Sequence, residues 1–289
     1  MKIRGDVHWL SNETGAYLKL GEQIYSLVGI PVDQQKVYWE QILAGNTEIF
    51  KDDNQFKEFY SFLNSKGAFE SEDIWTPYLH QQGIYIDNFQ GLLNSKKIAV
   101  VGDEDLVSEF QNLYGETFKN ISSTIQGSDF GLLIVRSHKS EEIKRYNKEF
   151  IENNIEFLPL MVQPFSYLLG PLVIPNETVC LNCVIEKKEK NLFYRKENKY
   201  FSNVTDSRNS SLPKPIINQG IDSLTIELIK RILHYENLAI ESGLIDTIID
   251  FSLLENKLEQ HNVMKDADCP ICFPTNPLNR EVIWMSKTK

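Results

Sequence analysis

Lys96-Lys97-Ile98-Ala99-Val100-Val101-Gly102 decides the fold class, because an apolar run that ends in glycine is typical of a buried strand that turns at its carboxyl end. Helical and strand patterns then alternate along the chain. We expect a helix, a strand, a second helix and a further strand at 105–114, 130–135, 140–153 and 156–162. Strands that alternate with helices form a parallel sheet with right-handed crossovers. The sequence therefore predicts an α/β fold.

The residues that follow this strand argue against a nucleotide cofactor. A nucleotide-binding turn at this place has the pattern G-x-G-x-x-G, because backbone N–H groups must come close to the phosphates. Here Gly102 is followed by three acids, Asp103, Glu104 and Asp105, and no second glycine. We therefore expect no ATP or NAD on this chain. The five histidines do not cluster in the sequence, and no catalytic residue is assigned.

The four cysteines fall into two C-x-x-C pairs, Cys180 with Cys183 and Cys269 with Cys272. Each C-x-x-C turn places two sulfurs on one side of a tight loop, and two such turns supply the four ligands of a tetrahedral zinc ion. Disulfides are the alternative, but a reducing cytoplasm disfavours them. A catalytic zinc would need an open coordination position. The sequence therefore predicts one structural zinc ion that joins the middle of the chain to its C-terminal part.

Beyond the first cysteine pair, residues 186–215 are polar and are expected to form a loop or crossover. Their basic residues indicate a solvated helix face or mobile loop rather than a binding patch: Lys187, Lys188, Lys190, Arg195, Lys196 and Lys199. A helix at 219–241 and a strand or strand pair at 245–254 complete the expected elements.

The N-terminal residues have a different pattern. Short strands are expected at 3–10, 16–20 and 23–28. A helix capped by Asp33 and a second one at 54–66, capped by Asp52 or Asp53, follow. Three strands and short helices describe a winged-helix-like module at 1–90, separate from a domain at 91–289. Such modules bind DNA, bind peptides by adding a strand to a sheet edge, or are structural.

Charge and hydropathy exclude several classes of protein. The chain of 289 residues has a formal net charge of −10, which argues against a nucleic-acid partner. The sequence lacks the ~20 consecutive apolar residues of a membrane helix and the apolar core of a secretory signal. We expect a cytoplasmic protein without a membrane partner.

The stretch Gly170-Pro171-Leu172-Val173-Ile174-Pro175, followed by the two cysteine pairs, resembles the ThiF-like (ubiquitin-activating-enzyme-like) zinc subunit of thiazole/oxazole-modified microcin synthases. The resemblance covers nearly the whole chain. It implies a winged-helix-like leader-peptide recognition module followed by a degenerate ThiF-like Rossmann-type domain. It also implies that the chain is not catalytic alone and serves as a scaffold.

The resemblance further implies how the leader of a ribosomally made precursor peptide binds. It would add as a strand beside the third strand and pack on the last helix. The corresponding positions here are Gln23, Ile24, Tyr25, Ser26, Leu27, Val28, Phe56, Phe59, Tyr60 and Leu63.

Three partners are implied by the same resemblance. They are a YcaO-type, ATP-dependent cyclodehydratase that forms azolines, a flavin-dependent dehydrogenase that oxidises them, and a second copy of the chain. Two other functions remain open. One is a ThiF-like adenylating enzyme acting on a peptide or carrier-protein C-terminus, and the other is a winged-helix DNA-binding regulator with a zinc clamp.

Overall fold

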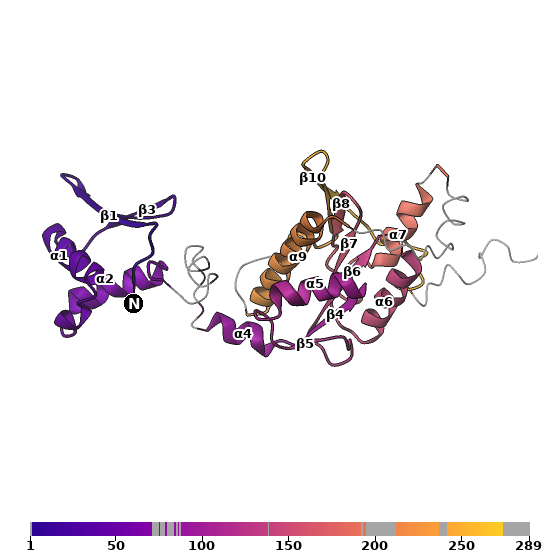
Figure 1. Ribbon diagram of the computed structural model, residues 1–289, viewed down its shortest axis with the longest axis horizontal. Helices are drawn as coiled ribbons and strands as arrows, with labels where there is room; N and C mark the ends of the chain where they lie inside the picture. Colours follow the sequence, from indigo (N-terminus) through magenta and orange to yellow (C-terminus); the bar gives the residue numbers. More distant parts are fainter. Residues whose placement is uncertain are drawn as a thin grey trace, which may run out of the picture. The chain divides into compact units, whose positions relative to one another are not determined.

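The computed structural model describes residues 2–70, 75, 79, 84, 86, 88–137, 139–191, 193–194, 212–236 and 242–273 (Figure 1). The chain divides into two compact units, Met1–Gly91 and Leu92–Lys289. In the described part of the chain, no helix is both long and apolar enough to cross a membrane.

The N-terminal unit is a three-stranded antiparallel sheet packed on helices. Its elements are β1 (Val7–Asn12), β2 (Gly15–Leu20), β3 (Gln23–Leu27), α1 (Val32–Leu43), the 3₁₀ helix η1 (Thr47–Phe50) and α2 (Asn54–Ser65). The sheet order is β1-β2-β3, so that β1 and β3 are its edges. Alternate strand residues such as Leu18 and Leu20 are buried against Tyr38 of α1 and Phe59 of α2.

Two boundaries in this unit differ from the sequence-based expectation. The first strand begins at Val7, because a turn at Gly5 and Asp6 separates it from Ile3, which forms an isolated bridge with Phe69. Helix α1 begins one residue before Asp33, after Pro31. Asp53, one of the two expected caps of α2, does cap it by accepting hydrogen bonds from the backbone N–H groups of Gln55 and Phe56.

The second unit is built on a seven-stranded mixed sheet in the order β10-β9-β8-β7-β6-β4-β5. Its strands are β4 (Ile98–Gly102), β5 (Ile121–Ser122), β6 (Phe130–Arg136), β7 (Phe157–Val162), β8 (Ser166–Leu169), β9 (Thr247–Ser252) and β10 (Lys257–Asn262). Its helices are α5 (Glu104–Tyr114), α6 (Ser140–Glu152), α7 (Leu181–Lys190) and α9 (Lys214–Tyr235), and the boundary between the two units falls within α4 (Phe89–Ser95). The α/β class is confirmed.

The parallel pairing expected of the strands at 96–102, 130–135 and 156–162 is confirmed, but the sheet as a whole is mixed. Strands β5, β4, β6 and β7 are parallel, but β8, β9 and β10 are antiparallel to their neighbours. The connection between β7 and β8 spans three residues, too few for the crossover that a parallel pair requires. The antiparallel half brings the chain after β10 back toward α7.

Helices cover both faces of this sheet (Figure 1). Helix α9 packs closely on β7, since a Cβ at Gly220 would lie 3.1 Å from Leu160 Cδ1. On the opposite face, α6 packs so tightly that a Cβ at Gly131 of β6 would lie on the ring of Phe150. That ring stacks on Phe157 at a centroid distance of 4.4 Å. The core on this second face also contains three of the four cysteines.

The segment after the first cysteine pair differs from the expected loop. It begins with α7, which continues to Lys190, whereas Arg195, Lys196 and Lys199 lie outside the described residues. The helix expected at 219–241 begins earlier, at Lys214, with Pro215 in its first turn. The part of that expected helix at 237–241 lies outside the described residues.

Candidate metal centre

The structure brings all four cysteines together. Cys180 is the N-cap of α7 and Cys183 lies in its first turn, while Cys269 and Cys272 lie in the loop that follows β10. The Sγ atoms are 3.7 Å apart between Cys180 and Cys183, 3.6 Å between Cys180 and Cys269, and 3.5 Å between Cys183 and Cys272. Three of the cysteines are buried and Cys272 is half-buried.

This arrangement fits a four-coordinate metal ion. The sulfur–sulfur distances exceed the ~2.05 Å of a disulfide, and all four cysteines are free. Sulfurs that surround zinc tetrahedrally at ~2.3 Å are ~3.8 Å apart, close to the observed separations. Four cysteine ligands leave no coordination position for water or substrate. The four cysteines can therefore bind a metal ion in a closed site.

Thiolate charge is stabilised within the cluster. The neighbouring side chains of Cys180 and Cys183 hydrogen-bond to Cys272 and lower the pKa of its thiol to about 4. Hydrogen bonding to Cys183 and Cys272, together with burial, raises the pKa of Cys180. The backbone N–H of Asp266 also donates to Cys183 Sγ over 3.2 Å. A divalent cation bound by the four sulfurs would neutralise part of this thiolate charge.

Lysines fasten the loop that carries the second cysteine pair. On α7, Lys187 donates to the carbonyl of Met264 and Lys190 pairs with Asp266, each at 2.7 Å. Lys265 donates to the carbonyl of Asn176 at 2.9 Å. The basic residues of α7 are therefore not only a solvated face, because Lys187 and Lys190 bind the loop that carries Cys269 and Cys272.

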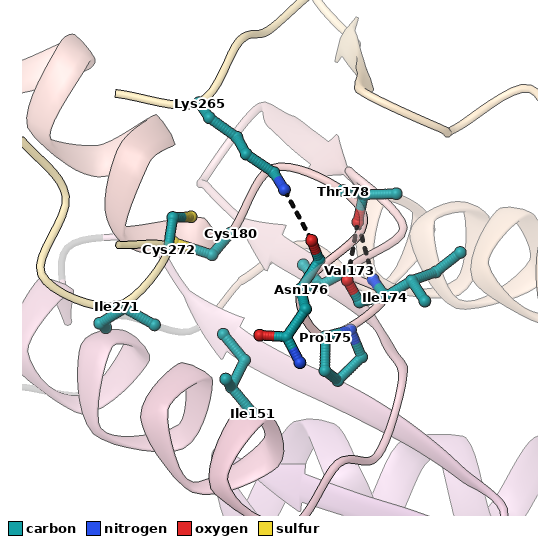
Figure 2. Close-up of a pocket in the computed structure, with 10 residues that line it drawn as sticks. All are labelled: Ile151, Val173, Ile174, Pro175, Asn176, Thr178, Cys180, Lys265, Ile271 and Cys272. Carbon is teal, nitrogen blue, oxygen red and sulfur yellow. Dashed lines mark hydrogen bonds between the residues drawn. The ribbon is translucent and has the colours of Figure 1, made fainter. Parts of the chain in front are cut away.

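A small crevice lies beside the cluster (Figure 2), with Cys180 and Cys272 on one side and the turn at Pro175 and Asn176 on the other. Its volume of about 10 Å³ has room for no more than about one water molecule. This crevice is therefore too small for a peptide or nucleotide substrate.

The carboxyl end of β4, where an α/β sheet holds a nucleotide phosphate, is filled by the chain's own ion pairs. Asp103 accepts a hydrogen bond from the backbone N–H of Arg136 over 2.7 Å and pairs with Lys139. Arg136 donates two hydrogen bonds to Asp105, at 2.9 and 2.6 Å, and these bonds lower the pKa of Asp105. The side chains of Asp103 and Arg136 are only 3% and 6% exposed.

Arg136 and Lys139 were not singled out in the sequence. Only the strand order could have indicated them. Arg136 ends β6, which lies beside β4, and the carboxyl ends of parallel strands meet at one edge of the sheet. The pairing could not be read from the sequence alone.

In the N-terminal unit, the expected peptide-binding positions fall into two groups. Residues Gln23–Leu27 form the edge strand β3, with Ile24 66% exposed, and Val28 lies just beyond its end. By contrast, three of the expected contact positions on α2 are buried in the unit's own core: Phe56, Phe59 and Leu63. They lie on the apolar face of α2, which packs on the sheet and α1. Tyr60 is half-buried.

Two other side chains, Phe62 and Lys66, lie beside Tyr25 of β3. Tyr25 and Phe62 contact each other edge to face at 6.1 Å. The ammonium group of Lys66 lies 5.0 Å from the ring centroid of Tyr25 and 5.9 Å from that of Phe62. Phe62 and Lys66 are therefore better placed beside the edge strand than the buried residues of α2.

No protein-family model matches the chain, and no curated protein matches it. Among solved structures, a heterocyclase in complex with substrate and cofactor has a TM-score of 0.67 and 16% identity. The heterocyclase TruD has a TM-score of 0.67 and 17% identity. Each match covers 94% of this chain but only 39% and 42%, respectively, of the heterocyclase chains.

The third neighbour is MccB from E. coli, described as a microcin C7 biosynthetic enzyme and solved with N-formylated MccA. It has a TM-score of 0.55 and 14% identity, and the match covers 94% of this chain and 99% of that chain. MccB has also been solved with ATP. At these identities the comparisons establish the fold alone. The chain shares its fold with heterocyclases and with a microcin C7 biosynthetic enzyme.

Proposed function

We propose that the chain is a non-catalytic, zinc-containing scaffold subunit of an azoline-forming synthase. In this proposal it binds the leader of a ribosomally made precursor peptide and presents the core peptide to a YcaO-type, ATP-dependent cyclodehydratase. The observation that carries the proposal is the ion-paired carboxyl end of β4. In this chain, Asp103 and Asp105 lie where phosphates would dock. Asp103 is paired with Lys139, and Asp105 is paired with Arg136.

Zinc is the metal proposed for the four cysteines. Thiolate ligands select zinc, and four of them form a closed structural site. Cys180, Cys183, Cys269 and Cys272 would hold the ion, which supplies folding free energy and no reaction step. The supporting observation is that the site connects α7 to the segment after β10, which are far apart in the sequence.

The leader is proposed to bind at the free edge of β3. An added strand would pair with the backbone of Gln23–Leu27 and place alternate side chains on the two faces of the sheet. Ile24 would contact the peptide on the outer face, and Tyr25 and Phe62 would contact it on the inner face. Lys66, which lies over both rings, would favour a nearby carboxylate of the peptide.

The remaining partners follow from the same proposal. The ATP-dependent step is assigned to the cyclodehydratase, because Asp103 and Asp105 are ion-paired where phosphates would dock on this chain. A flavin-dependent dehydrogenase, a homodimeric state and a cytoplasmic location are also proposed. All four cysteines are free thiols, which is the state that the reducing conditions of the cytoplasm maintain.

Peptide binding can be tested with two matched variants. The probe is a fluorescein-labelled leader of a short Cys-, Ser- and Gly-rich precursor peptide, and its binding is measured by fluorescence anisotropy. Ile24→Glu on β3 should weaken binding at least tenfold. Leu10→Glu should not, because Leu10 is also 66% exposed but lies on β1, the opposite edge. Equal effects of the two variants, or no binding above an unrelated peptide, would contradict leader binding at β3.

The second candidate function is a ThiF-like adenylating enzyme that acts on a peptide or carrier-protein C-terminus. The specific observation in its favour is that the match to MccB, which has been solved with ATP, covers 99% of that chain. ATP–pyrophosphate exchange with the purified chain separates the two candidates. The scaffold predicts no exchange above a protein-free control, and adenylation predicts exchange that depends on the acceptor.

A further inference from the structure

One buried side chain connects the proposed metal centre to a carboxylate outside it. Asn182, between the first two cysteines, is 5% exposed. Its Nδ2 lies 3.5 Å from Cys269 Sγ and 3.1 Å from Glu186 Oε1. An amide nitrogen carries two hydrogens, so both contacts are made as donors.

The orientation of this amide follows from its neighbours. Both the sulfur and the carboxylate are acceptors, and a carbonyl oxygen turned toward them would have no hydrogen to share. Glu186 is one helical turn beyond Asn182 on α7, so the helix fixes their separation. The carboxylate therefore holds the amide with one N–H directed at Cys269.

The four-cysteine site gives this contact a chemical role. Four thiolates and one divalent ion carry a net charge of about −2, which must be stabilised inside a largely buried cluster. Backbone N–H groups, among them those of Asp266 and Cys272, also donate to these sulfurs. Asn182 thus supplies the side-chain donor to a sulfur of the cluster.

A second asparagine supports the same helix end. Cys180 is the N-cap of α7 but makes no side-chain cap hydrogen bond. Asn147 of α6, which is fully buried, accepts a hydrogen bond from the backbone N–H of Leu181 over 3.0 Å. The cap that would normally come from the N-cap side chain is therefore supplied by another helix, which leaves the sulfur available for a metal.

We propose that Asn182 is a positioning residue of the metal centre, oriented by Glu186, whose amide stabilises the Cys269 thiolate and slows loss of the ion. The arrangement corresponds to the carboxylate that orients a metal-bound histidine, with an amide and a thiolate in place of the imidazole. The inference rests on the proposed zinc ion but not on peptide binding.

The test compares three variants of the full chain: Asn182→Leu, Glu186→Ala and the control Glu189→Ala. Zinc per chain is measured first, and then the rate at which a chelator removes it. Asn182→Leu should release zinc about tenfold faster, the lower end of the effect of such outer contacts. Glu186→Ala should change the rate in the same direction by a smaller factor, and Glu189→Ala should match the wild type.

Cobalt substitution separates an effect on sulfur from a loss of packing. Removal of an N–H donor raises the energy of the sulfur electrons, so the thiolate-to-cobalt charge-transfer band of Asn182→Leu should move to lower energy. Unchanged release rates and an unchanged band in a folded variant overturn the inference. If Asn182→Leu does not fold, the test rests on Glu186→Ala. A zinc-release rate of Glu186→Ala equal to that of Glu189→Ala then overturns the inference. A wild-type chain without bound metal instead refutes the proposed zinc centre.

Discussion

Replacement of Cys269 by serine tests the structural role of the metal. Cys269 is fully buried, its sulfur lies 3.6 Å from Cys180 Sγ, and the exchange changes little volume. The main consequence should therefore be loss of the ion, which releases the segment after β10 from α7. The second unit, Leu92–Lys289, should lose stability, whereas the first unit has its own core and should not.

The size of the effect follows from linkage. A ligand that binds only the folded state at about a thousand times its dissociation constant contributes about 4 kcal/mol. For a unit of about 200 residues, 1 kcal/mol shifts Tm by about 2–4 °C. Cys269→Ser should therefore lower the Tm of the second unit by about 8–16 °C.

Differential scanning calorimetry with and without a chelator provides the assay. The chelator should bring the wild type to the Tm of the variant and should leave the variant unchanged. The transition of the N-terminal unit serves as an internal control. A variant that retains one zinc ion, or a zinc-free variant that melts at the temperature of the zinc-bound wild type, would refute the structural role.

Three further predictions concern the fold around the sites. The pKa of Asp105 is lowered by its guanidinium partner, so the stability it contributes is present above its unfolded pKa of ~3.9 and is lost as pH falls through the folded value. Asp105→Asn should accordingly have a lower Tm than the wild type at pH 7, and the difference should shrink as the pH falls through the lowered pKa of Asp105. Gly102→Ala should destabilise the second unit by about 2 kcal/mol or more in urea unfolding, because φ is +133° and the new Cβ would lie 2.0 Å from the carbonyl oxygen of Ile134. Asp53→Ala should cost the N-terminal unit about 1 kcal/mol through loss of its helix cap, whereas Asp52→Ala should leave its Tm unchanged.

Apolar runs made the central strands predictable. Strands β4, β6 and β7 are buried on both faces, so each is a continuous apolar segment whose sequence is unambiguous. Strand β8 was missed because it is only four residues long, and its two inward side chains give too short an alternation to recognise. Because β8 was missed, the short turn between β7 and β8 was missed as well. That turn is what makes β8 antiparallel to β7.

The candidate sites show the same limit. The C-x-x-C spacing is visible in the sequence, so the four cysteines could be chosen as candidate metal ligands before any geometry was known. Phe56, Phe59 and Leu63 have the spacing of one helix face, but spacing cannot say whether that face meets the core or a partner. Asn182 gave no signal, because its role depends on a sulfur that lies 87 positions away in the chain.

Reconstitution of peptide modification tests the central claim most directly. The purified chain and a YcaO-type cyclodehydratase, separately and together, are incubated with the precursor peptide and ATP, and the peptide is analysed by mass spectrometry. The scaffold account predicts loss of water from the core peptide only when both proteins are present, with ATP consumed in no reaction that contains this chain alone. ATP-dependent modification by the chain alone, or equal modification by the cyclodehydratase without it, would contradict the account.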